Sequence, residues 1–142
     1  FANCVSLSSI TISETVSRIG KQAFYNCKNL KKLTIPKSVK TVSMSAFAGS
    51  GLKKIVLPEN VTTIKNGDAG RKVFKYTKGI NYPTKNLRVI EIHSKKVKSI
   101  QKNSFSGLSS KVVIKVPKSK KKKYTKMLRK SGLSKKVKIC NL

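Results

Sequence analysis

The sequence has no tryptophan, one histidine, three cysteines and only four acidic residues, and the last three scarcities argue against catalysis and metal binding. The acidic residues are Glu14, Glu59, Asp68 and Glu91. Each lies in a different part of the chain, so no carboxylate pair for acid–base catalysis is expected. The cysteines are Cys4, Cys27 and Cys140. Their spacing fits neither a disulfide framework nor a zinc site. We therefore expect no enzymatic activity, no metal and no cofactor.

The chain also lacks long apolar runs and balanced charge. No apolar run reaches the roughly 18 residues that a membrane-spanning helix requires. Thirty-three Lys and Arg residues face the four acids, which gives a net charge of +29. A field of this strength attracts polyanions and opposes self-association, so a monomer is expected. The charge alone does not choose among nucleic acid, acidic glycan, wall polymer and anionic lipid. A lysine-rich surface with no selected role is the alternative.

A repeat organises the first half of the chain. Phe1, Phe24 and Phe47 follow one another at a constant spacing of 23 residues, a period typical of a solenoid. Each unit contains a Leu-x-x-Ile-x-Ile segment that alternates like a short strand, and a Val-x-x-Ile segment that returns along the opposite wall. The corner at 20–27 is expected to be a helical turn. The strand residues expected to face inward are Ile10, Ile12, Leu33, Ile35, Ile55 and Leu57.

The repeat is interrupted after Ile64, because the next Leu of the pattern arrives only at Leu87. The insertion lies within 65–86 and contains Phe74, a candidate core residue, and the tyrosines Tyr76 and Tyr82, which are expected in a loop. A fourth and a degenerate fifth unit follow. We therefore predict a repeat array of about five units at 1–117 and a cap at 118–142. Because the sequence begins inside a unit, we expect it to be a piece of a longer protein.

The last segment changes character and predicts a helix at 118–130. Tyr124, Met127 and Leu128 form one apolar stripe at helical spacing, and Gly132 lies where a helix C-terminus favours left-handed backbone. Val137 and Ile139 alternate with lysines and indicate a final strand. A helix and a strand would close the open end of a solenoid, which repeat arrays require for solubility.

The pattern Ile-Pro-x-x-Val-x-x-Ile-x-x-x-Ala-Phe-x-x-Cys-x-x-Leu resembles the BspA-like leucine-rich repeat family. It runs here from Ile12 to Leu30 and recurs from Ile35 to Phe47. The sequence departs from the pattern in the insertion at 65–86 and at Ser50, which replaces the Cys of the third unit. The resemblance implies a right-handed leucine-rich repeat solenoid of the α/β horseshoe class, dominated by short parallel strands that line its concave side.

The same resemblance implies a bacterial cell-surface or secreted protein, extracellular in location and of the kind often proposed as an adhesin. The expected function is therefore a binding or adhesion module that contacts a host or neighbouring-cell surface protein or an acidic glycan. One alternative is a structural spacer held to anionic cell-wall polymers. A second alternative is non-specific nucleic-acid binding, for which Lys120–Lys123 is the candidate patch. Arginine is scarce and no specific nucleic-acid motif occurs, and these lysines also fit a solvated helix face. No membrane insertion is expected.

The outward strand positions define the candidate ligand surface. Three columns are expected on the concave face: Ser9, Lys32, Lys54, Val89 and Val113; Thr11, Thr34, Val56, Glu91 and Lys115; and Ser13, Pro36, Pro58, His93 and Pro117. A basic ridge lies at the sheet edge. The candidate ligand residues are Lys31, Lys32, Lys53, Lys54, Arg88, Tyr76 and Tyr82, the tyrosines because recognition commonly lies on loops of a rigid scaffold. Ordinary solvated lysines are the alternative for this cluster. Cys4 and Cys27 are expected as buried thiols in adjacent units, with a disulfide geometrically conceivable.

Overall fold

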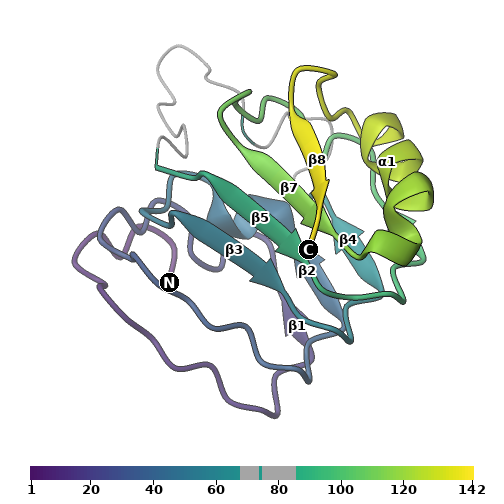
Figure 1. Cartoon of the computed structure of the whole chain (residues 1–142). Helices are drawn as coiled ribbons and strands as arrows, with labels where there is room; N and C mark the ends of the chain where they lie inside the picture. Colours follow the sequence, from purple (N-terminus) through teal and green to yellow (C-terminus); the bar gives the residue numbers. More distant parts are fainter. Residues whose placement is uncertain (68–73, 75–85) are drawn as a thin grey trace.

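The computed structural model describes residues 1–67, 74 and 86–142. Its strands form two parallel four-stranded sheets (Figure 1). The first sheet has the order β1-β2-β4-β6, and its strands are Arg18–Ile19, Thr41–Ser43, Thr63–Lys65 and Ser99–Ile100. The second has the order β3-β5-β7-β8, and its strands are Lys54–Leu57, Val89–Ile92, Val113–Val116 and Lys138–Asn141. This is the predicted leucine-rich repeat solenoid, in which successive units stack through parallel strands on two walls.

The core fills the space between the two sheets. Alternation along β3 sends one side chain in two inward, so Ile55 and Leu57 are buried and align with the buried Ile90 and Ile92 of β5. Phenylalanines stack along the corner of successive units, with ring centroids 6.0 Å apart for Phe1 and Phe24 and 6.3 Å apart for Phe24 and Phe47. Phe74 is buried in the same core, as expected. Each buried side chain of this size contributes roughly 1.5–3 kcal/mol, so stacking holds the array together.

The first two units depart from the expected strand pattern. Within the described residues 1–53, no strand forms at 7–12 or 30–35, and the second sheet begins only at β3 of the third unit. Ile10, Ile12 and Leu33, expected to face inward, are only partly buried, whereas Ile35 is buried. The alternation of these segments matches a strand, but a strand also needs ladder hydrogen bonds to a neighbour. The return segments do pair in these units, since β1 lies parallel to β2 with Ile19 opposite Val42.

The corner at 20–27 is a series of turns and not the expected helical turn. Gln22 and Asn26 both have φ of 58°, and left-handed backbone interrupts a right-handed helical turn. In the second unit the corner does include a short 3-10 helix, η1, at Met44–Phe47. The second residue after Phe1, Phe24, Phe47 and Phe105 has positive φ, and these residues are Asn3, Asn26, Gly49 and Gly107. Asn and Gly are the residues that tolerate this conformation.

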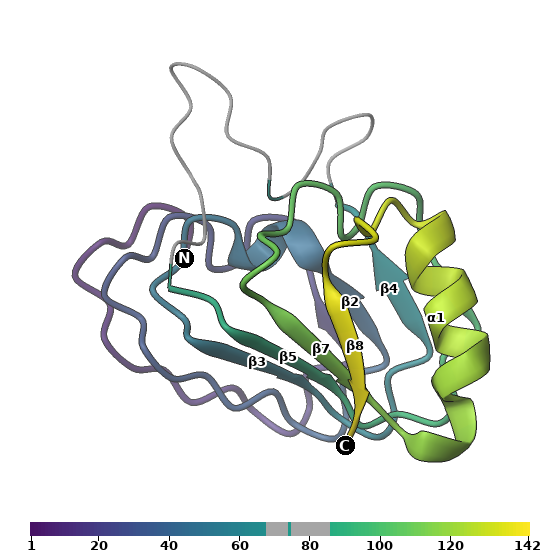
Figure 2. The same cartoon turned by 45° about the horizontal axis from the view of Figure 1, so that its top comes forward.

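The C-terminal segment forms the expected helix and strand. A 3-10 turn, η2 at Lys118–Lys120, leads into the helix α1 at Lys121–Lys130, and β8 then pairs in parallel with β7. The helix contacts β6 and β8, and it occupies the end of the stack where the first sheet would otherwise add a strand (Figure 2). Tyr124 secures this end, because its hydroxyl donates to Ser94 O and accepts from Val97 N, both at 3.0 Å. Gly132 has φ of 92°, as its position after the helix predicts.

Candidate functional site

The outward positions of the β3-β5-β7-β8 sheet form an exposed surface, here called the open face. The strand register places Lys54, Val89 and Val113 in one column and Val56, Glu91 and Lys115 in the next. The sequence predicted both columns for these units. The third predicted column is only partly correct, because His93 is exposed but Pro36, Pro58 and Pro117 are buried. Each of these prolines directly follows a buried apolar residue: Ile35, Leu57 or Val116.

Glu91 is the centre of a charged cluster on the open face. Its Oε1 lies 3.0 Å from Lys54 Nζ and 3.7 Å from Lys115 Nζ, and its Oε2 lies 2.9 Å from His93 Nε2. A carboxylate only accepts hydrogen bonds, so the imidazole donates. The side chain of Glu91 is 11% exposed, whereas those of Lys54, Lys115 and His93 are 51%, 41% and 46% exposed. We call these four residues the Glu91 cluster.

The environment of Glu91 keeps its carboxylate charged. Burial alone would raise the pKa of Glu91, but the hydrogen bonds from His93 and Lys54 and the electrostatic effects of these two residues outweigh burial, so the pKa of Glu91 lies below its ordinary value. Because Lys54 is half exposed, solvent screens much of this attraction and the pair adds little stability. The cluster therefore fixes the position of Lys54 and neutralises part of the open face.

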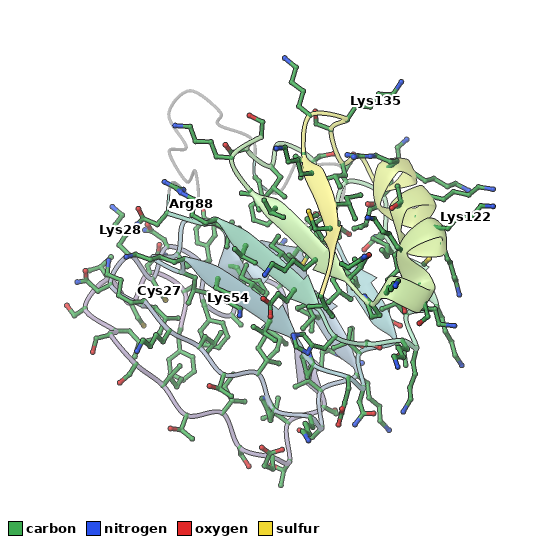
Figure 3. All side chains as sticks on the ribbon, in the orientation of Figure 1. Cys27, Lys28, Lys54, Arg88, Lys122 and Lys135 are labelled. Atoms are coloured by element: carbon green, nitrogen blue, oxygen red, sulfur yellow. The ribbon has the colours of Figure 1, made fainter. Side chains whose placement is uncertain are left out.

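Lysines and one arginine follow the sheet edge at the start of the strands. Arg88 N donates to Lys53 O at 2.9 Å, so these two residues lie side by side in adjacent units. Lys31 holds the equivalent position in the preceding unit, and its Nζ donates to Lys28 O at 3.3 Å. All three side chains belong to exposed residues. We call Lys31, Lys53 and Arg88 the basic edge, and Figure 3 shows Lys28 and Arg88 on this side of the molecule.

The remaining candidate ligand residues have different surroundings. Lys32 is exposed in the segment that forms no strand. Lys54 is exposed on the open face but is paired with Glu91, so the predicted lysine cluster combines solvated cations with one held by a carboxylate. Tyr76 and Tyr82 lie outside the described residues.

A shallow depression of about 610 Å³ adjoins the Glu91 cluster. It lies where β5, β7 and β8 end, and its lining residues are His93, Lys95, Pro117, Lys118, Ser119 and Leu142. Its volume falls within the range of about 300–1,000 Å³ typical of ligand pockets. The depression is open to solvent, so it adds contact area to the open face more than it encloses a ligand.

The cysteines do not form a ladder of buried thiols. Cys27 is buried and its thiol donates to Phe1 O at 3.0 Å, but Cys4 is exposed, and neither is in a disulfide. Burial raises the pKa of the Cys27 thiol despite smaller opposing effects, which favours the unreactive neutral form. In the part of the chain that the structure describes, no three His, Cys, Asp or Glu side chains gather as metal ligands. No described helix has the length and apolar content to cross a bilayer.

The stacked parallel strands, the repeating buried core and the 23-residue period define this chain as a leucine-rich repeat solenoid. A family model described as BspA type leucine rich repeat region matches residues 1–69 and 80–141 in six copies. The chain therefore belongs to this family. The matched region runs to residue 141, and so includes the segment predicted as a cap. Leucine-rich repeat families are typically binding modules and not enzymes.

A solved structure gives the same fold. The crystal structure of the pneumococcal vaccine antigen PcpA matches with a TM-score of 0.54 and 23% sequence identity, over 89% of this chain and 34% of that one. The chain thus spans about a third of the length of that protein. None of the curated proteins that were compared matches the chain.

Proposed function

We propose that this chain is the binding module of an extracellular bacterial surface protein, and that its basic edge contacts acidic glycans or acidic surfaces of host proteins. The family supports a binding role. The likeness to a vaccine antigen supports an extracellular location, because antibodies reach such a protein from outside the cell.

The observation that carries the proposal is the regular placement of cations on a rigid scaffold. The backbone hydrogen bond between Arg88 and Lys53 fixes two cationic residues in adjacent units, which in a sheet lie ~4.8 Å apart. Side chains that start from backbone positions fixed at such intervals can meet successive sulfate or carboxylate groups of a polymer, and only the side chains have to be ordered on binding. The Glu91 cluster confines the attraction to the edge, because it neutralises Lys54 beside it.

The experiment compares two triple variants of equal charge. Lys31→Ala/Lys53→Ala/Arg88→Ala removes the basic edge, and Lys40→Ala/Lys65→Ala/Lys98→Ala removes three exposed lysines beside or within strands of the other sheet. On a heparin column in a salt gradient, the edge variant should elute at clearly lower salt than the control variant. Elution of both variants together would show that only net charge matters, and would reject a site at the edge.

The sequence alternative of a spacer held to anionic wall polymers also finds support in the structure. The lysines of the C-terminal helix lie away from the basic edge and offer a second cationic surface (Figure 3).

A further inference from the structure

A third of the positive charge lies in the C-terminal segment. Residues 118–142 contain 11 of the 33 Lys and Arg residues and none of the four acids. Among the described residues, no ion pair joins a lysine of α1 to a carboxylate. Glu59 pairs with Lys37, and Glu91 pairs with Lys54 and Lys115 of the open face. The charge of this helix is therefore not balanced by the described part of the chain.

The fold aligns these charges on one side of α1. Tyr124 and Leu128 are buried toward the array, and the opposite side carries the exposed residues Lys122, Lys123, Lys126 and Lys130, here called the α1 lysine face. Lys122, Lys126 and Lys130 recur at every fourth position, so they form a row ~12 Å long with one cation about every 6 Å. Figure 3 shows Lys122 pointing away from the body of the protein.

This arrangement opposes the local stability of the helix. Lys121–Lys123 lie in the first turn, which contains no acidic residue and has no side-chain cap. Cations at this end face the positive pole of the helix dipole, and like charges four residues apart repel. A helix with this sequence is stable because Tyr124 and Leu128 anchor it to the array. When a sequence departs from such helix preferences without a gain in stability, the departure commonly marks a functional surface.

The chemistry of the face indicates the kind of partner. Lysine acts on a phosphate as a mobile point charge, whereas planar bidentate recognition favours arginine. Arg129, the arginine of the helix, is committed to Ser134 O and Val137 O. Insertion into a membrane needs a free apolar helix face, but the apolar face of α1 is buried. Single-stranded nucleic acid is held by base stacking on aromatic side chains, but Tyr124, the only aromatic residue of α1, is fully buried.

We propose that the α1 lysine face docks a linear phosphodiester polymer that has no bases, of the polyol-phosphate class found in anionic cell walls. Successive phosphates contact the row of lysines, and the polymer backbone makes no base-specific contact. This surface is separate from the basic edge (Figure 3, Lys122 against Arg88). Binding at the α1 lysine face therefore does not depend on a glycan site at the basic edge.

The test uses synthetic poly(glycerol phosphate) as the probe and measures its affinity by calorimetry at several salt concentrations. Lys122→Gln/Lys126→Gln/Lys130→Gln removes the row while keeping good helix formers, and Lys40→Gln/Lys65→Gln/Lys98→Gln is the charge-matched control. We expect the row variant to bind about 10-fold or more weakly and the control less than 3-fold more weakly. The dependence of log affinity on log salt should also become shallower in the row variant, because fewer counterions are released. Equal losses in both variants, or no loss in the row variant, would overturn the proposal.

Two further arms separate the partner classes. Oligo(dT) with the same number of phosphates should bind no more tightly than poly(glycerol phosphate), and tighter binding would replace the proposed polymer with nucleic acid. The basic-edge variant Lys31→Ala/Lys53→Ala/Arg88→Ala should retain binding of poly(glycerol phosphate). A parallel loss in that variant would show that the two surfaces act as one and would reject a separate site on α1. Circular dichroism of each variant verifies that α1 is folded.

Discussion

The contact between the second and third units at Gly51 gives the sharpest test of how the basic edge is built. Gly51 N donates to Cys27 O at 3.1 Å. A Cβ at Gly51 would lie 2.1 Å from Lys28 O and 3.0 Å from Leu30 O, and both atoms belong to the backbone. Neither can rotate away, so Gly51→Ala must push the two units apart beside Leu30, the residue before Lys31, and two residues before Lys53.

The expected cost has two parts. Overpacking of a tight contact costs about 1–3 kcal/mol, and loss of the Gly51–Cys27 hydrogen bond costs about 1 kcal/mol more. Together they reach ~2–4 kcal/mol, a large share of the ~5–15 kcal/mol by which domains are stable. For a domain of this size, the melting temperature should fall by roughly 5–15 °C.

Gly20→Ala is the matched control. No atom lies within 4 Å of a Cβ at Gly20, and its φ is not in the left-handed region. The substitution should therefore be neutral or stabilise by about 0.4–1 kcal/mol, because it restricts the unfolded chain. Urea unfolding followed by circular dichroism measures both variants. If Gly51→Ala loses less than about 1 kcal/mol relative to Gly20→Ala, the units are not packed as closely as described and the spacing of the basic edge loses its structural basis.

Three further predictions concern single residues. The pKa of Glu91 is lowered on folding, so its contribution to stability is present above the unfolded pKa of about 4.3 and is lost as pH falls through the folded value. Glu91→Gln should therefore reduce the loss of stability with falling pH, measured as urea midpoints from pH 7 to pH 3. The same loss of stability in the variant and the parent would contradict the Glu91 cluster. Tyr124→Phe should destabilise by about 1–3 kcal/mol, because a buried donor and acceptor lose their partner, and should speed hydrogen exchange at the Val97 amide; unchanged exchange there would refute the contact. Asn26→Ala should cost about 1–2 kcal/mol more than Asn26→Gly, because only the alanine strains the left-handed backbone; equal melting temperatures for the two would count against strain at this corner.

The repeat made much of the fold predictable because each unit carries the same information. Period and alternation together place Lys54 beside Val89 and Val56 beside Glu91, and the register confirms both. The C-terminal helix was predictable from its apolar stripe and from Gly132. The absence of strands at 7–12 and 30–35 was not, because alternation reports which side chains can face a core and says nothing of whether a neighbouring backbone lies within hydrogen-bonding distance.

The Glu91 cluster was missed although its signal was present in the sequence. Glu91 and His93 are two residues apart on a strand and so share a face, and the aligned columns place Lys115 beside Glu91. The expectation that no carboxylate pair forms is a statement about acids alone, and it leaves out the cations that can partner Glu91. The residues with positive φ at the corners were also missed. Asn26 and Gly49 both follow a phenylalanine by two residues. Their side chains have no chemistry in common, but both residues tolerate positive φ.

The placement of the acids shows how a chain of this charge can fold and still attract anions. Glu59 and Glu91 each neutralise lysines that a strand or turn already holds in place, whereas no acid occurs at 118–142. Self-repulsion should therefore be concentrated at α1. Because the Debye length falls from about 30 Å at 0.01 M salt to about 8 Å at 0.15 M, added salt should raise the melting temperature, and hydrogen exchange should show the largest gain in protection in α1. A melting temperature that falls with salt would mean that ion pairs on the open face dominate. It would remove the premise that the helix lysines are unbalanced.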